Sequence, residues 1–257
     1  EYIKEGDIFE VNLAQRFSAP FTNPEQSYAL YQRLSQINPS PFSAFLNFGE
    51  CKILSASPER FIRLENRCVE TRPIKGTRAR HVDPIQDKQH ISELLNSEKD
   101  FAENIMIVDL MRNDLAKVCE DDSIIVTQLC AHEVYPTVHH LVSVIRGQLK
   151  VSKTAFDLLK AVFPGGSITG APKIRAMQII AELEPHCRGP YCGNLILLGF
   201  DGYMDSSILI RTFVLNKDKL TFHAGGAVVL DSDPKMEYEE TLIKAYALQK
   251  ALNKDPI

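Results

Sequence analysis

The sequence lacks the features that would place it in several large classes of protein. No apolar run approaches the roughly 20 residues of a membrane-spanning helix, and the longest stretches, NLILLGF and IMIVDLM, suit a protein core. The net charge is only −4, so neither nucleic acid nor an anionic membrane is indicated as a partner. No signal peptide is recognisable, and no segment repeats with a period of about 20 to 50 residues.

Paired metal-binding cysteines are also missing. The six cysteines lie at positions 51, 68, 119, 130, 187 and 192, and no CxxC pair occurs among them. A zinc ribbon or a redox dithiol is therefore not expected. We predict free, buried thiols in a reducing compartment, and the cytoplasm is the expected location.

What is present indicates a large globular domain, with 44% apolar and 24% charged residues in a chain of 257. Helices are predicted at 23–38, 84–118 with a break near Asn96 and Ser97, 153–162, 172–184 and 233–252. Strands are predicted at 7–19, in hairpins turning at Gly49-Glu50 and near Asn66-Arg67, and at 123–130, 139–149, 193–202, 206–216 and 219–229. Because strands and helices are grouped rather than alternating, we expect an α+β fold with largely antiparallel sheets.

Two of the predicted helices carry acidic residues. In DFAENIMIVDLMRNDL an apolar stripe contains Phe101, Ile105, Val108, Met111 and Leu115, and the polar residues Glu103, Asn104, Asp109 and Asp114 lie off it. In the last helix Glu237, Glu240 and Lys244 share one face. Carboxylates from separate helices are hard ligands that suit Mg²⁺, whereas the alternative is two solvated faces with one salt bridge.

The glycine-rich stretch GGSITGAPK does not match a phosphate-binding Walker loop, because Ala171 and Pro172 separate the second glycine from the lysine. It still ends at a helix N-terminus and could bind a phosphate or a carboxylate, aided by Ser167 and Thr169. A second small-residue segment, HAGGAVV, could be a ligand approach or a glycine bulge. Arg211, inside the predicted strand ILIRTF, requires an acidic partner, either in the protein or in a ligand.

The stretch ETRPIKGTRAR leaves three possibilities open for Lys75. A lysine beside a tight glycine turn can be a solvated loop charge, a phosphate ligand or a nucleophile.

Several stretches together resemble the chorismate-utilising enzymes, a family that includes anthranilate synthase component I, aminodeoxychorismate synthase component I, isochorismate synthase and salicylate synthase. These stretches are GDIFEVNLAQRF, NPSPFSAF, SASPERF, TRPIKGTRAR, ENIMIVDLMRNDL, GGSITGAPK, GPYCG and EYEET, in the family's order. The resemblance implies two packed, largely antiparallel β-sheets with outer helices. It also implies that residues 1–257 are one chorismate-binding catalytic domain, the C-terminal part of a longer chain.

The resemblance also assigns roles to residues. It implies that Glu103 and Glu240 hold Mg²⁺, with Glu237 nearby, and that His140 is the active-site histidine. A tryptophan pocket, where the family has one, involves Pro41, Phe42 and Ser43. The implied contacts to chorismate are Gly76, Thr77, Thr169, Gly170, Tyr191, Arg211, Gly225, Gly226, Ala227 and Lys244.

Within the family, the sequence Pro-Ile-Lys-Gly-Thr resembles aminodeoxychorismate synthases, whereas anthranilate synthases usually have Ala in place of the lysine. The implied reaction is Mg²⁺-dependent amination of chorismate at C4, with Lys75 as covalent nucleophile and Glu59 as general acid. Glu10 stands where water-adding members have lysine and amino-transferring members usually have glutamine. Ammonia is expected from a separate glutaminase subunit. The alternatives are anthranilate synthase component I and a catalytically silent chorismate-binding module.

Overall fold

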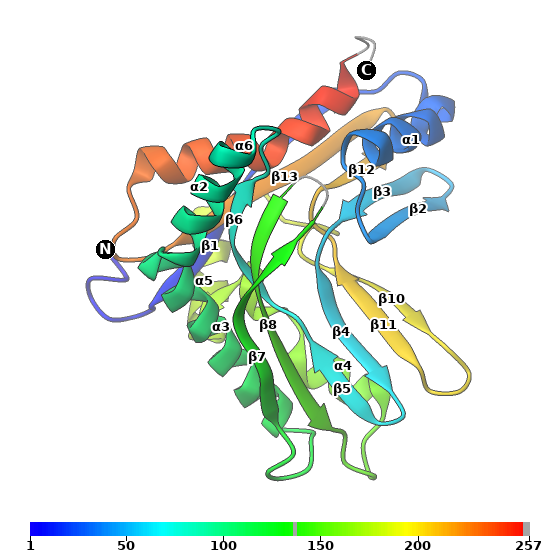
Figure 1. Cartoon of the computed structure of the whole chain (residues 1–257). Coiled ribbons are helices and arrows are strands. Elements are labelled where there is room, and N and C mark those ends of the chain that lie inside the picture. Colours follow the sequence, from blue (N-terminus) through cyan, green and yellow to red (C-terminus); the bar gives the residue numbers. More distant parts are fainter. Residues whose placement is uncertain (136–137, 254–257) are drawn as a thin grey trace. The chain divides into compact units, whose positions relative to one another are not determined.

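The computed structural model describes residues 1–135 and 138–253, which form two compact units (Figure 1). Unit 1 contains Glu1–Glu59, Ile168–Leu195 and the chain from Ser207 onward. Unit 2 contains Arg60–Ser167 and Ile196–Ser206. Within the residues described, no helix is both long enough and apolar enough to cross a membrane.

Unit 1 is built on a six-stranded sheet in the order β2-β3-β12-β13-β1-β9, in which neighbouring strands are antiparallel. Its strands are β1 (Glu10–Pro20), β2 (Phe42–Phe48), β3 (Cys51–Ser57), β9 (Gly170–Ala171), β12 (Thr212–Asn216) and β13 (Lys219–Val228). The longest pairing joins β1 to β13, from Val11 opposite Val228 to Pro20 opposite Lys219. This pairing forms the centre of unit 1.

Helices cover this sheet with their apolar sides. They are α1 (Ser27–Ile37), α5 (Lys173–Leu183) and α6 (Pro234–Leu252), and the short helix η1 (Pro24–Gln26) leads into α1. Helix α6 contacts β13 and α1, and α5 contacts β1 (Figure 1). Asp233 starts α6 because its carboxylate accepts the backbone N–H groups of Lys235 and Met236, and Pro234 suits the first helical position.

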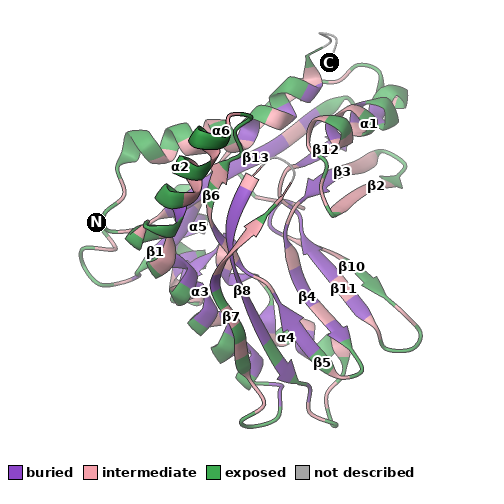
Figure 2. Cartoon of the chain, in the orientation of Figure 1, coloured by how far each residue is buried: buried purple, intermediate pink, exposed green. Residues whose placement is uncertain are grey.

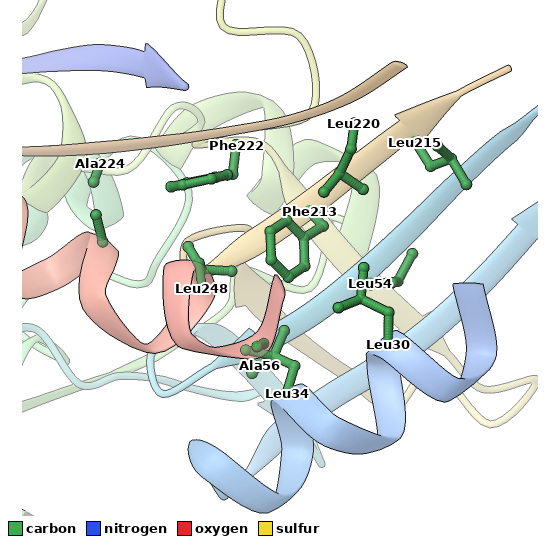
Figure 3. Close-up of a cluster of buried hydrophobic side chains, with 12 residues drawn as sticks. Leu30, Leu34, Leu54, Ala56, Phe213, Leu215, Leu220, Phe222, Ala224 and Leu248 are labelled. Carbon is green, nitrogen blue, oxygen red and sulfur yellow. The ribbon is translucent and has the colours of Figure 1, made fainter. Parts of the chain in front are cut away.

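The main core of unit 1 lies between α1, α6 and strands β3, β12 and β13. Figure 3 shows Leu34 of α1 and Leu248 of α6 directed toward Phe213 of β12. The ring of Phe213 meets that of Phe222 edge-on, with centroids 5.5 Å apart. Burying these side chains holds both helices on the sheet, at roughly 1.5–3 kcal/mol for each large apolar residue.

The second sheet has seven strands in the order β10-β11-β4-β5-β8-β6, with β7 also pairing with β8. The strands are β4 (Arg60–Glu65), β5 (Cys68–Thr71), β6 (Ile74–Ala79), β7 (Ile125–Val134), β8 (Val138–Gln148), β10 (Asn194–Leu198) and β11 (Met204–Ile208). Strand β8 pairs antiparallel with β5, β6 and β7 and is buried along most of its length (Figure 2).

Unit 2 contains helices α2 (Pro84–Leu95), α3 (Glu98–Ala116) and α4 (Ala155–Val162), and η2 (Gly166–Ile168) runs to its boundary. Helix α3 contacts β6, β7 and β8. The predicted break between α2 and α3 is confirmed, and Ser97 caps α3 by accepting the N–H of Asp100.

The predicted α+β class with two largely antiparallel sheets is confirmed, as are the hairpin turns at Gly49-Glu50 and at Asn66-Arg67. The single strand predicted at 206–216 is wrong. It divides into β11 and β12, because Arg211 adopts a φ of +50° that interrupts a strand.

The apolar stripe predicted for α3 is also wrong in part. Ile105 is 42% exposed, whereas Glu103, Asn104 and Asp114 are buried. The polar side chains are accommodated by bonds: Asn104 donates to the carbonyl of Leu141, and Asp114 accepts from Lys117. Hydrophobicity alone could not place them, because the bonding partners come largely from outside the helix.

Candidate active-site residues in the two units

Lys75 lies in β6 of unit 2, beside an irregularity in the sheet. Lys75 is opposite Leu141 and Thr77 is opposite His140, and the register shifts between them at Gly76. Gly76 has a φ of +80°, and a Cβ there would lie 3.0 Å from Asp100 Cβ. Glycine is thus required at this bulge on two grounds, its backbone conformation and the packing of α3.

The side chain of Lys75 is buried against Glu103 of α3. Its Nζ lies 3.7 Å from Glu103 Oε2, and both side chains are only 9% exposed. Lys99 approaches the other oxygen of Glu103 at 3.8 Å, but its side chain is 41% exposed. Of the three initial possibilities for Lys75, the solvated loop charge is therefore wrong. A buried amine close to a carboxylate can exchange a proton with it and act as a nucleophile.

His140 of β8 is fixed by a neighbouring strand. Its Nδ1 is hydrogen-bonded to Thr77 Oγ1 at 2.8 Å, and its ring meets the Tyr135 ring edge-on with centroids 5.2 Å apart. The hydrogen bond at Nδ1 orients the imidazole, as expected for a histidine that transfers a proton. Unit 2 thus brings together Lys75 with Glu103, and Thr77 with His140.

In unit 1, α6 and β13 bring together the other predicted metal ligands. An ideal Cβ at Gly226 would lie 3.4 Å from both Glu237 Oε2 and Glu240 Oε1, and 3.8 Å from Lys244 Nζ. Lys244 also pairs with Glu240 at 2.5 Å, which is the i,i+4 salt bridge expected under the alternative interpretation of two solvated helix faces. The predicted common face of α6 is confirmed. The carboxylates of Glu237 and Glu240 therefore both lie beside Gly226, which has no side chain to fill the space between them.

This convergence fits a hard divalent cation such as Mg²⁺, which takes carboxylate oxygens and keeps several waters. No group of three or more His, Cys, Asp or Glu side chains placed to hold a metal occurs among residues 1–135 and 138–253. Glu237 and Glu240 belong to unit 1, and the third predicted ligand, Glu103, belongs to unit 2.

The glycines of β13 and β9 permit close approach of strands. A Cβ at Gly225 would lie 2.1 Å from the carbonyl oxygen of Leu13, and one at Gly170 would lie 2.1 Å from that of Glu10. The register of β1 and β13 is continuous through Gly225 and Gly226. The bulge considered for HAGGAVV is therefore wrong, since these glycines lie in a regular strand.

Arg211 is not inside a strand but between β11 and β12. Its Nη1 donates to Asn38 Oδ1 at 3.1 Å. Burial lowers the pKa of the guanidinium, and the negative charge of Glu59 acts in the opposite direction. Glu59 is itself buried just after β3, where Ser57 Oγ accepts its backbone N–H. The predicted general acid and the predicted carboxylate-binding arginine are thus electrostatically linked.

The remaining predicted residues of unit 1 lie in several different strands and loops. Thr169 and Tyr191 are buried, and the carbonyl of Thr169 accepts the N–H of Asn12. Ala227 is buried in β13, and Glu10 is buried in β1 opposite Ala171. Pro41, Phe42 and Ser43 lie at the start of edge strand β2, where Ser43 Oγ donates to the carbonyl of Ser40.

Two features near Tyr191 were not predicted. The ring of His223 stacks on that of Tyr191, with centroids 4.9 Å apart, and the Glu184–Arg188 ion pair lies close to both. The histidine of HAGGAVV and the charged residues of ELEPHCRG were visible in the sequence, but no periodic pattern indicated their contacts. All six cysteines are free, as predicted, but the predicted burial holds for only three of them: Cys68 and Cys187 are exposed and Cys51 is half-buried.

Comparisons with known proteins identify the family. Residues 1–250 match the family model described as chorismate binding enzyme. The chain is 51% identical over 243 residues to aminodeoxychorismate synthase component 1 of Salmonella typhimurium, covering 95% of this chain and 53% of that protein. It is 47% identical to anthranilate synthase component 1 of Thermus thermophilus, covering 98% of this chain and 54% of that protein.

The fold agrees with a solved relative. The crystal structure of anthranilate synthase component I from Streptococcus pneumoniae matches with a TM-score of 0.85 and 42% identity, over 95% of this chain and 54% of that one. The chain spans about half the length of these relatives. On the family match over nearly its whole length, the chain belongs to the chorismate binding enzymes.

Proposed function

We propose that this chain is the chorismate-binding catalytic part of an aminodeoxychorismate synthase component 1, which converts chorismate to 4-amino-4-deoxychorismate for p-aminobenzoate and folate synthesis. The observation that carries the proposal is the burial of Lys75 beside Glu103, within a sequence 51% identical to the Salmonella enzyme. A lysine held away from water has the environment that a nucleophilic amine needs.

The proposed reaction replaces a hydroxyl by nitrogen in two allylic steps. The Lys75 amine attacks C2 of chorismate, the double bonds shift, and the C4 hydroxyl leaves as water after protonation. Ammonia then attacks C4, the double bonds shift back, and the C2–N bond to Lys75 breaks. Hydroxide is a poor leaving group, so Glu59 serves as the acid that protonates it. One difficult displacement thus becomes two easier steps.

Other residues prepare these steps. Glu103 accepts the proton that Lys75 must lose before attack, since it is the carboxylate 3.7 Å away. Arg211 and Lys244 are cations suited to the substrate carboxylates. His140, fixed through Thr77, is available to move a proton at the substrate.

Glu237, Glu240 and Glu103 would hold the proposed Mg²⁺. When bound, the ion would neutralise a carboxylate of the substrate. The convergence of Glu237 and Glu240 on Gly226 supports this assignment.

Ammonia is proposed to come from a separate glutaminase subunit. The relative's name, component 1, implies a partner subunit for that protein. The predicted cytoplasmic location and the predicted extent of the catalytic domain remain predictions.

The proposal is tested by product analysis in the protein at its full natural length, with chorismate, ammonium and Mg²⁺. Lys75→Ala should lower 4-amino-4-deoxychorismate formation by about 100-fold or more, because the nucleophile is lost. Lys99→Ala is the matched control, since Lys99 also pairs with Glu103 but is exposed; it should retain more than about a third of the activity. Equal 4-amination by Lys75→Ala and the parent would refute the proposed role.

A second candidate function is that of anthranilate synthase component I, favoured by the 47% identity to the Thermus enzyme. That reaction places nitrogen at C2 and releases pyruvate. Pyruvate formed in the same assay, without an added lyase, would decide for it. A chain that binds chorismate and turns over none of it would instead indicate a silent binding module.

A further inference from the structure

A partly buried ion pair follows helix α5 in unit 1. Arg188 donates to Glu184 through Nε at 2.9 Å and through Nη2 at 2.6 Å, so the contact is bidentate. The exposed fractions of the two side chains are only 14% and 7%. Burial lowers the pKa of Arg188 and is the largest single influence, but the hydrogen bonds that Glu184 accepts and the nearby negative charges together raise it more, so the net shift is upward. A buried pair is tolerated only when its remaining donors and acceptors are also bonded.

The remaining bonds of this pair go to strand β1. Strand β9 pairs with β1 only at Glu10 and Val11, and Asn12 then donates its N–H to the carbonyl of Thr169. Beyond that point Arg188 Nη2 donates to the carbonyl of Asn12, and the N–H of Ala14 donates to Glu184 Oε1 at 2.9 Å. Strand β9 thus bonds to the start of β1, and the side chains of the ion pair bond to the residues of β1 that follow.

The same guanidinium holds two segments that carry predicted substrate contacts. Arg188 Nη1 donates to the carbonyl of Ile168 at 2.8 Å, directly before Thr169. The same atom also contacts Cys192 Sγ at 3.5 Å, directly after Tyr191. The backbone N–H of Tyr191 in turn donates to the carbonyl of Arg188. Arg188 thus bonds to the residue directly before Thr169 and to the residue directly after Tyr191.

The ring of Tyr191 is fixed as well. It stacks on His223 with an interplanar angle of 13°, and the Arg188 guanidinium carbon lies 5.7 Å from its centroid. Burial raises the pKa of the Tyr191 hydroxyl well above its usual value, so the hydroxyl stays protonated and can donate a hydrogen bond. A cation near the ring face adds attraction that is strongest when water is excluded.

We propose that the Glu184–Arg188 ion pair positions Thr169 and Tyr191 for binding the chorismate carboxylates and thereby sets the affinity for substrate. The proposal rests on the proposed function, because it takes Thr169 and Tyr191 as substrate contacts. Arg188 and Glu184 are positioning residues, since beyond their own ion pair they contact the backbone, Tyr191 and Cys192. Their loss should weaken binding of the substrate more than the covalent steps at Lys75.

The first test is Arg188→Lys, which keeps the charge but loses the planar fork that bonds several groups at once. The KM for chorismate should rise by about tenfold, while kcat changes by less than about threefold. Glu184→Gln, which keeps the size but removes the charge, should act in the same direction. The matched control is Arg175→Lys, on α5 itself, where the arginine pairs with Asp7 away from these segments; its KM should equal the parent's.

A purely structural ion pair is distinguished by a double-mutant cycle with Tyr191→Phe. If Arg188 acts through Tyr191, the KM of the double variant should be no higher than that of the worse single variant. The proposal would be overturned if the increases in KM of the two single variants multiply in the double variant. It would also be overturned if Arg188→Lys lowers the melting temperature but leaves KM unchanged. If the parent protein consumes chorismate but makes another product, the proposed 4-amination is refuted. The proposed role of the ion pair is still tested in that case, because the KM for chorismate can be measured from its consumption.

Discussion

The two lysines beside Glu103, Lys75 and Lys99, differ in how far their side chains are exposed to water, and this difference distinguishes a candidate nucleophile from a surface charge. Both have Nζ within 4 Å of the Glu103 carboxylate, yet one side chain is shielded from water and the other is not. An exposed pair contributes little, about 0–1 kcal/mol, whereas burial alters the proton affinity of an amine. The sequence motif alone could not make this distinction, because burial of Lys75 depends on α3 packing over β6.

His223 is a residue whose importance only the structure reveals. Its pKa is lowered from 6.5 to about 4, chiefly by burial, so the folded protein holds a neutral imidazole. Its Nε2 has no hydrogen-bond partner among the residues described. The ring stacks on that of Tyr191.

This burial predicts a pH-dependent stability. Between pH 6.5 and pH 4 the unfolded chain binds a proton at His223 and the folded chain does not, so stability falls as the pH falls through this window. Above pH 6.5 the residue makes no such contribution. His223→Gln should remove the effect, so that from pH 7 to pH 4 the variant loses up to about 3 kcal/mol less unfolding free energy than the parent.

Urea denaturation at several pH values measures this difference. The control is His186→Gln, at an exposed histidine in the loop after α5. Parallel stability curves for the parent and for His223→Gln would contradict the assignment of a buried neutral imidazole.

At the scale of elements, β13 and α6 together present the predicted metal ligands. Sequence periodicity predicted correctly that Glu237, Glu240 and Lys244 share a face, because a helix imposes that geometry locally. It could not show that this face meets Gly226, since the contact joins two elements. The error for α3 has the same origin: Asn104 is buried because β8 offers the carbonyl of Leu141.

Adjacent glycines of β13 should respond differently to the same substitution. Gly225→Ala places a Cβ 2.1 Å from a backbone oxygen of β1, and should destabilise the fold by about 3 kcal/mol or more. The nearest atoms to a Cβ in Gly226→Ala belong to side chains, at 3.4 Å for the two carboxylates and 3.8 Å for Lys244 Nζ, so stability should change by less than about 1 kcal/mol. The added methyl group would nevertheless occupy the point on which Glu237 and Glu240 converge.

Denaturation measures the first effect, and calorimetric titration with Mg²⁺ in the presence of chorismate measures the second. Gly226→Ala should need about tenfold more Mg²⁺ for half-saturation. A variant with the parent's Mg²⁺ affinity would show that this face of α6 does not hold the ion.

For the whole molecule, the sequence predicted the fold class, because grouped strands, hairpin turns and helix caps are local signals. Most element boundaries followed from the same signals, but strands β6 and β9 were not predicted, and the interruption at Arg211 reflects a positive φ that residue propensities do not indicate. The candidate site was predicted mainly through family resemblance. Its bonding partners, such as Thr77 for His140 and Asn12 for Arg188, depend on contacts between segments distant in the chain.

The assignment among family members rests on Lys75, because the family includes enzymes that aminate chorismate at different carbons. Intact-protein mass spectrometry with chorismate and Mg²⁺, but without ammonia or glutamine, tests this assignment most directly. If Lys75 is the nucleophile, the protein gains the mass of chorismate less one water, the adduct maps to Lys75 after digestion, and Lys75→Ala shows none. An unmodified protein that nevertheless aminates chorismate at C4 when ammonia is added would contradict this assignment.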